Sequence, residues 1–89
     1  SSIAGILVVH FHLTIQELAM TEDVLKRLGA RIRFLREQAG ISQETLGLRS
    51  GLHRTYIGAI ERGERNPSVL SLKKIVDALH IHFGDLFHE

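Results

Sequence analysis

From Thr21 onward, apolar residues recur at steps of three and four positions, which is the spacing of one face of an α-helix. Polar residues such as Arg31 and Glu37 occupy the positions between them. Gly40 then supplies a residue type that commonly ends a helix. The pattern therefore predicts a first helix up to residue 39, whose apolar stripe consists of Val24, Leu25, Leu28, Ile32, Leu35 and Ala39.

Four shorter helical segments follow. Ser42 suits the N-cap of a helix over residues 43–50, and a third helix covers residues 53–62. The turn sequence Asn66-Pro67-Ser68 precedes a fourth helix, and a last turn over residues 83–87 is expected to close the core as a fifth. The fourth stripe consists of Leu70, Leu72, Ile75, Val76 and Leu79. The sequence thus predicts an all-α fold of five helices.

The first 20 residues show a different pattern. Val9, Phe11, Leu13 and Ile15 alternate with more polar residues, which is the period of a half-buried β-strand. Because a lone strand leaves its backbone groups unpaired, we expect this strand to pair with its counterpart in a second copy. The segment is too short for a membrane span and has no basic residues before it, which argues against a signal peptide or a transmembrane helix. We predict an N-terminal apolar arm or extension, residues 1–20, and a domain of residues 21–89.

Composition and charge narrow the function classes. The chain has 89 residues, 44% of them hydrophobic, and a formal net charge of +1. Residues 26–66 contain nine Lys and Arg residues against four acidic ones, whereas the segments on either side are net negative. A local excess of Arg is what a surface that binds a polyanion needs. The absence of Cys excludes disulfides, thiolate zinc sites and cysteine nucleophiles.

The segment from Gln43 to Ile60 has the spacing of two short helices that cross at a steep angle. Gly47 is small enough for a close backbone approach, and Gly51 permits the positive φ angle of a tight turn. Apolar residues that can fix the angle occupy positions 46, 52, 57 and 60. Such a pair projects the start of its second helix outward, which is how a recognition helix enters the major groove of DNA.

The sequence resembles the phage Cro and repressor-type, or XRE-like, helix-turn-helix family over Leu25–Phe87. Within that family it looks most like the controller proteins of restriction-modification systems. Gly47 departs from the family pattern, which usually has Ala there, and the segment before Met20 has no counterpart in the minimal family domain. The resemblance rests on Arg31-Ile32-Arg33-Phe34-Leu35-Arg36, Gly40-Ile41-Ser42-Gln43-Glu44, Ser50-Gly51-Leu52-His53-Arg54-Thr55-Tyr56-Ile57, Ile60-Glu61-Arg62-Gly63, Arg65-Asn66-Pro67-Ser68 and Leu79.

The resemblance implies a role in DNA binding for several residues. Gln43 matches a residue that meets the phosphate backbone, and Arg54 and Thr55 match the main base-reading positions. A guanidinium such as that of Arg54 can donate two hydrogen bonds to guanine, and Thr55 could contact a thymine methyl group or a phosphate. Tyr56 has the alternative of a half-buried core aromatic, and Arg62 that of a solvated surface charge. The DNA-binding candidates are Gln43, His53, Arg54, Thr55, Tyr56, Ala59, Arg62, Asn66 and Ser68.

The resemblance also implies structural and assembly roles. Arg36 and Glu61 match an ion pair that joins the first helix to the recognition helix, and Gly51 forms the turn. Dimer contacts are expected around the last helix, at His82, Phe83, Leu86 and Phe87. The pairs His10/His12 and His80/His82 lack a third ligand nearby, so we expect no metal and no cofactor.

These features favour a binding protein over an enzyme, since no catalytic or phosphate-loop motif is present. The leading hypothesis is a cytoplasmic transcription regulator that binds double-stranded DNA as a homodimer on a palindromic operator. Neither a membrane nor a small-molecule substrate is expected as a partner. The alternative hypothesis is a protein-interaction module, or an antitoxin-like partner, that uses the same helical frame.

Overall fold

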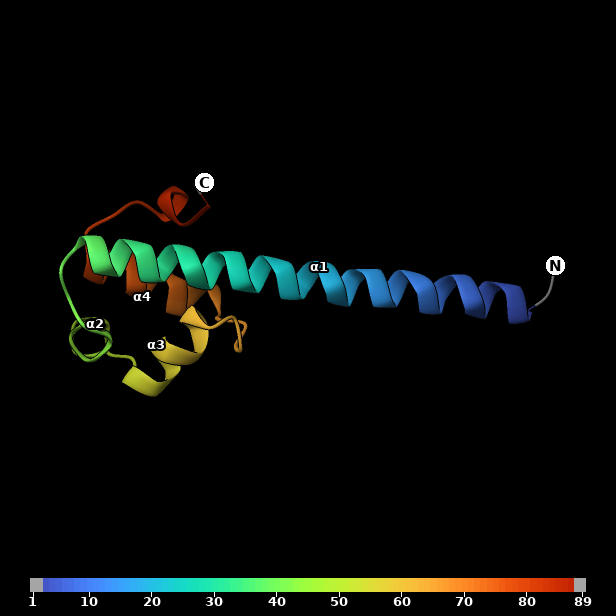
Figure 1. Cartoon of the computed structure of the whole chain (residues 1–89), viewed down its shortest axis with the longest axis horizontal. Coiled ribbons are helices and arrows are strands. Elements are labelled where there is room, and N and C mark those ends of the chain that lie inside the picture. Colours follow the sequence, from blue (N-terminus) through green and yellow to red (C-terminus); the bar gives the residue numbers. More distant parts are fainter. Residues whose placement is uncertain (1–2, 88–89) are drawn as a thin grey trace.

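The computed structural model describes the backbone of residues 3–87 and the side chains of residues 14–87. Over this range the chain forms the helices α1 (Ile3–Gln38), α2 (Gln43–Ser50), α3 (Arg54–Glu61) and α4 (Val69–Leu79), followed by the 3₁₀ helix η1 (Phe83–Phe87). In Figure 1, the first half of α1 extends beyond the bundle that its second half forms with the other elements. The fold is all-α, as predicted.

Two details of the sequence-based prediction were wrong. The segment predicted as a strand is part of α1, which runs without interruption from Ile3 to Gln38. Residues 3–13 are apolar at most positions, so the spacing fits a helix as well as a strand, and a helix satisfies its own backbone hydrogen bonds. The predicted fifth helix is a short 3₁₀ turn.

The core lies where the second half of α1 meets the other elements. α1 packs against α3 and η1, and α2 packs against α3 and α4. Every element contributes to one cluster of buried side chains, whose fully buried members are Ile32, Leu46, Ile57, Ile60, Ile75, Val76 and Leu86. The helices that carry the candidate DNA-binding residues are therefore held on a common apolar core.

Local sequence signals fix the boundaries of the short helices. Ser42 and Ser68 are N-caps whose side-chain oxygens accept hydrogen bonds from the backbone N–H groups of Thr45 and Ser71. Gly51 ends α2 in the left-handed conformation, with a φ angle of 76°. These residues place the turn between α2 and α3 where the sequence predicted it.

Two glycines allow backbones to approach closely. A Cβ atom at Gly29 of α1 would overlap the carbonyl oxygen of Ile60 and lie 2.6 Å from that of Glu61, so α1 rests directly on the end of α3. A Cβ atom at Gly47 of α2 would lie 2.7 Å from the carbonyl oxygen of Leu52. The absence of a side chain at Gly47 therefore brings α2 close to the turn, which offsets the low helix propensity of glycine.

Candidate nucleic-acid interface

The start of α3 projects from the bundle. Arg54 and Thr55 are its first two residues, and both are exposed. The same helix buries Ile57 and Ile60 against the core, so its two faces are clearly distinct. The pair α2 and α3 thus presents a guanidinium and a hydroxyl group to the solvent, as a recognition helix must.

His53 caps this helix through its side chain. Its Nδ1 accepts a hydrogen bond of 3.1 Å from the backbone N–H of Thr55, and the same nitrogen lies 2.7 Å from Thr55 Oγ1. His53 is exposed. The side chain of His53 therefore caps α3 while it faces the solvent.

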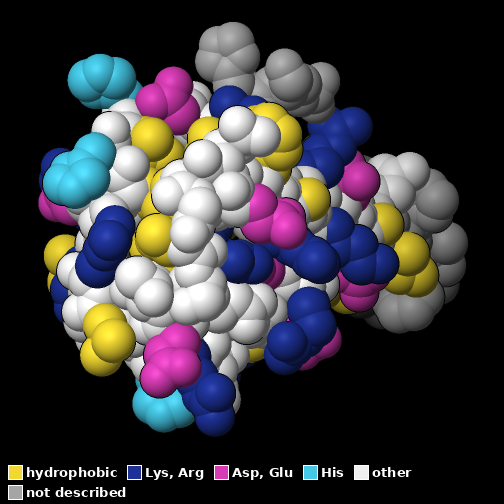
Figure 2. Space-filling model, turned by 60° about the vertical axis from the view of Figure 1, so that its left-hand side comes forward, with side chains coloured by type: hydrophobic (Ala, Val, Ile, Leu, Met, Phe, Trp, Pro, Cys, Tyr) yellow, Lys and Arg dark blue, Asp and Glu magenta, His cyan; other side chains and the backbone are white. Residues whose placement is uncertain are grey.

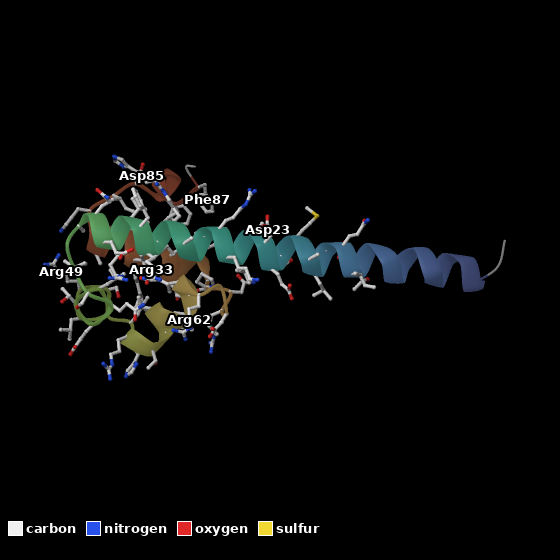
Figure 3. All side chains as sticks on the ribbon, viewed as in Figure 1. Asp23, Arg33, Arg49, Arg62, Asp85 and Phe87 are labelled. Carbon is white, nitrogen blue, oxygen red and sulfur yellow. The ribbon has the colours of Figure 1, made fainter. Side chains whose placement is uncertain are left out.

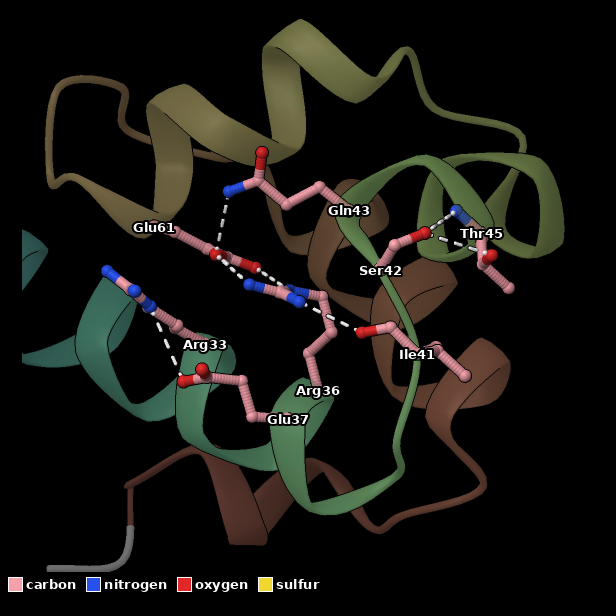
Figure 4. Close-up of polar contacts among 8 residues, drawn as sticks. All are labelled: Arg33, Arg36, Glu37, Ile41, Ser42, Gln43, Thr45 and Glu61. Carbon is pink, nitrogen blue, oxygen red and sulfur yellow. Dashed lines mark hydrogen bonds and ion pairs between the residues drawn. The ribbon is translucent and has the colours of Figure 1, made fainter.

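A single buried carboxylate joins α1, α2 and α3 (Figure 4). Glu61 accepts hydrogen bonds from Arg36 Nε at 2.7 Å and from Arg36 Nη2 at 3.0 Å, and its side chain is 2% exposed. Arg36 Nη1 also donates to the carbonyl oxygen of Ile41 at 2.9 Å. The hydrogen bonds that Arg36 donates to Glu61 raise the pKa of Arg36 above its ordinary value, against the opposing effect of burial.

Gln43, the first residue of α2, shares this carboxylate. Its Nε2 donates to Glu61 Oε1 at 3.0 Å, and Figure 4 shows its side-chain oxygen on the opposite side, away from Glu61. Because a carboxylate only accepts hydrogen bonds, the Gln43 atom that faces Glu61 must be the amide nitrogen, and this fixes the orientation of the amide group. Gln43 is partly exposed, so one amide N–H remains for an external acceptor.

Arg62 lies beside Gln43. A Cβ atom at Gly58 would lie 3.1 Å from Arg62 Nη1 and 3.3 Å from Gln43 Oε1, so both side chains converge over this glycine of α3. Arg62 Nε also donates to Glu64 at 2.9 Å. That hydrogen bond lowers the pKa of the Glu64 carboxyl, and the positive charge of Arg62 adds to the effect.

A second polar cluster joins Tyr56 to the start of α4. The guanidinium carbon of Arg65 lies 5.4 Å from the centre of the Tyr56 ring, and the Tyr56 hydroxyl donates to Ser71 Oγ at 3.4 Å. Ser68 Oγ lies 3.0 Å from the same Ser71 hydroxyl. Tyr56 is therefore half-buried and packs against the core, as the interpretation of a half-buried core aromatic has it.

The remaining DNA-binding candidates lie around these groups. Ala59 of α3 is half-buried. Asn66 is exposed in the turn after α3, where it lines a groove together with Thr21 and Leu25 of α1. The structure thus brings Gln43 and Arg62 together and Tyr56 near Ser68, while Asn66 lies beside α1.

Basic side chains gather on this end of the molecule. On the face shown in Figure 2, Lys and Arg side chains are most numerous in the middle and the right-hand part and also occur at the left and lower edges, with acidic side chains among them. In Figure 3, Arg49 and Arg62 lie on one side of α1, and Asp85 and Phe87 lie on the other. The side with Arg49 and Arg62 and the C-terminal turn therefore lie on different sides of α1.

The predicted dimer residues lie in and next to η1. Phe83 and Phe87 are 36% and 61% exposed, whereas Leu86 is buried in the protomer's own core. The backbone N–H of His82 donates to Asp85 at 2.8 Å, which caps the turn. Phe87 and Leu86 also line an apolar groove of about 480 Å³ together with Val24 and Leu28 of α1.

The described side chains hold no cluster of three or more His, Cys, Asp or Glu residues that could bind a metal ion. The side chains of His10 and His12 lie outside the described residues. Across residues 3–87, none of the helices has the length and apolar character needed to cross a membrane.

Comparison with known proteins agrees with the helix-turn-helix geometry of α2 and α3. A model of the helix-turn-helix family matches residues 32–86. The chain belongs to the helix-turn-helix family. This helix-turn-helix protein is 41% identical over 68 residues to the control protein C.BamHI of Bacillus amyloliquefaciens, covering 75% of this chain and 84% of that protein. It is also 36% identical over 64 residues to the HTH-type transcriptional regulator y4dJ of Sinorhizobium fredii, covering 72% of this chain and 83% of that one.

Solved structures give the same result. The crystal structure of the restriction-modification controller protein C.AhdI from Aeromonas hydrophila matches this helix-turn-helix protein with a TM-score of 0.70 and 48% identity, over 71% of this chain and 96% of that one. The expected family and the likeness to controller proteins are thus confirmed. The relatives are regulators and control proteins, so this helix-turn-helix protein is a member of a regulator family and not an enzyme.

The sequence did not predict some of the side-chain contacts in this helix-turn-helix protein. It did not place Gln43 on Glu61, because residues 18 positions apart on different helices give no periodic signal. It did not assign Arg65 or Ser71 to the Tyr56 cluster. For Ser71, the spacing Ser68-x-x-Ser71 at the start of α4 was the available signal, because an N-cap side chain bonds the third residue after it.

Proposed function

We propose that this protein is a sequence-specific transcription regulator that binds double-stranded DNA as a homodimer on a palindromic operator. Its likeness to control proteins supports a role as the controller of a restriction-modification system. The observation that carries the proposal is the exposed start of α3, with Arg54 and Thr55 outward on a frame tied to α1 by the Arg36–Glu61 pair. We place this activity in the cytoplasm and in residues 21–89, with residues 1–20 as an N-terminal arm.

In this proposal some residues of α2, α3 and α4 contact the bases of DNA and others contact its phosphates. Arg54 and Thr55 read base edges, and Ala59 faces the groove one turn later. His53 and Tyr56 contact DNA beside them. Backbone phosphates are bound by Gln43, Arg62, Asn66 and Ser68, and the positive end of α4 at Ser68 favours a phosphate.

The C-terminal turn would join two copies. Phe83 and Phe87 are exposed aromatic residues next to an apolar groove, and their rings lie 6.0 Å apart. His82 and Leu86 flank them in the same turn. Two copies joined there would present two α3 helices to half-sites about 34–36 Å apart, one turn of the DNA helix.

Binding to duplexes selected from a random library tests the proposal. Arg54→Ala should lower affinity for the selected operator by roughly 1–3 kcal/mol and affect a scrambled duplex much less. Gln43→Ala should weaken both duplexes about equally. Lys74→Ala, an exposed cation on α4, is the charge-matched control. Equally weak, salt-independent binding of all duplexes by the parent protein would support the protein-interaction alternative instead.

A further inference from the structure

The contact between His53 and Thr55 determines where their hydrogen atoms lie. The backbone N–H of Thr55 donates to His53 Nδ1 at 3.1 Å, so this nitrogen must offer a lone pair and carries no hydrogen. In a neutral imidazole, the hydrogen then resides on Nε2, at the far side of the ring. Among the described residues, His53 Nε2 has no hydrogen-bond partner.

The hydroxyl of Thr55 is fixed by the same argument. Thr55 Oγ1 lies 2.7 Å from His53 Nδ1, and a hydrogen atom is needed between two such atoms at this distance. Since Nδ1 has none, the hydroxyl of Thr55 donates it, and the single lone pair of Nδ1 is shared between this hydroxyl and the Thr55 backbone N–H. Thr55 Oγ1 is left with lone pairs only, next to an exposed methyl group.

We infer that His53 and Thr55 form one DNA-contacting pair whose hydrogen-bond donors and acceptors are fixed, which we call its fixed polarity. His53 offers DNA a single N–H donor, and Thr55 offers only an acceptor and a methyl group. This inference rests on the proposed DNA-binding function and adds the chemistry that each residue recognises. It makes His53 a DNA-contacting residue as well as a helix cap.

The fixed polarity restricts what each residue can contact. Phosphate oxygens only accept hydrogen bonds, so Thr55 has no hydrogen to offer them. Its acceptor matches the exocyclic amino groups of adenine N6 or cytosine N4 in the major groove, and its methyl group can pack on a thymine methyl. His53 Nε2 requires an acceptor, which both phosphates and base edges provide.

The tautomer can be measured in the absence of DNA. We expect ¹⁵N NMR of the His53 ring at about pH 8, where an ordinary imidazole is neutral, to show Nδ1 without a hydrogen and Nε2 with one. The opposite tautomer would overturn the inference and leave the proposed function unaffected. A correct tautomer in a protein that binds no duplex would count against the proposed function alone.

Two variants test the polarity on DNA. Thr55→Val keeps the shape and the backbone cap but removes the acceptor, and should lower affinity for the selected operator about tenfold with no change on a scrambled duplex. An equal loss on both duplexes would mean a phosphate contact and would overturn the inference. Thr55→Ser, which keeps the hydroxyl, is the matched control for the acceptor.

His53→Asn tests the outward donor separately. Asn is a strong N-cap, so the thermal midpoint should be unchanged. Affinity should fall about tenfold, on all duplexes if the acceptor is a phosphate and on the selected operator alone if it is a base. Unchanged affinity on every duplex would overturn the role assigned to His53.

Discussion

Replacing Glu61 with alanine would remove the acceptor of three hydrogen bonds, two from Arg36 and one from Gln43. The Arg36 guanidinium, whose side chain is 11% exposed, would keep only its bond to the Ile41 carbonyl. Removing one partner of a buried ion pair costs about 3–5 kcal/mol, because the remaining charge stays buried. Natural domains are stabilised by only about 5–15 kcal/mol, so the loss is a large fraction of the total.

Urea unfolding followed by far-UV circular dichroism measures this loss directly. The midpoint should fall while the dependence on urea concentration stays the same, which indicates a change in stability alone. Glu64→Ala is the matched control, because it breaks an ion pair with Arg62 in which both side chains are 58% exposed. Exposed pairs contribute little, so the control should unfold almost as the parent protein does.

A double variant separates charge burial from loss of packing. Arg36→Met with Glu61→Leu removes both charges and should recover most of the stability lost in Glu61→Ala. Recovery should fall short by about 1 kcal/mol, because Gln43 and the Ile41 carbonyl lose their partners. If Glu61→Ala were no more destabilising than Glu64→Ala, the reasoning about the buried pair would be refuted.

Two further predictions concern α1 and the exposed ion pair. Gly29→Ala should lower the thermal midpoint, because the new methyl group would overlap the Ile60 carbonyl and overpacking of this kind costs about 1–3 kcal/mol; a raised midpoint, as helix propensity alone predicts, would contradict the close contact. The Glu64 carboxyl should titrate below the ordinary pKa of glutamate in an NMR titration, and Arg62→Ala should restore that pKa. Since the folded-state pKa is lowered, the contribution of the pair to stability is complete above the ordinary range and disappears as the pH falls through the folded-state value. An unchanged Glu64 pKa in Arg62→Ala would show that the pair does not form in solution.

The sequence predicted α2, α3 and α4 well because their boundaries are local. Ser42, Gly51 and Ser68 each act within a few residues of their own position, as caps or stops. The buried face of α3 followed from Ile57 and Ile60 at helical spacing. Such signals need no knowledge of the rest of the fold.

The N-terminal segment and the site details depended on information that the sequence pattern lacks. In residues 9–15, alternation suggested a strand. The run from residue 3 is apolar at most positions and so satisfies both periods, and no proline separates it from the helix that follows. The contact between His53 and Thr55 required interatomic distances. The contact of Gln43 with Glu61 required the packing of α2 on α3.

The ion pair of Glu61 also determines the smallest segment of this protein that could be transplanted into another protein with its structure intact. A peptide containing only α2 and α3 would carry Glu61 and Gln43 but not Arg36, which lies 25 residues before Glu61 on α1. The Glu61 carboxylate would then be solvated, and the angle between α2 and α3 would no longer be stabilised by the ion pair with Arg36. Any graft that aims to keep the orientation of Arg54 must therefore include the second half of α1.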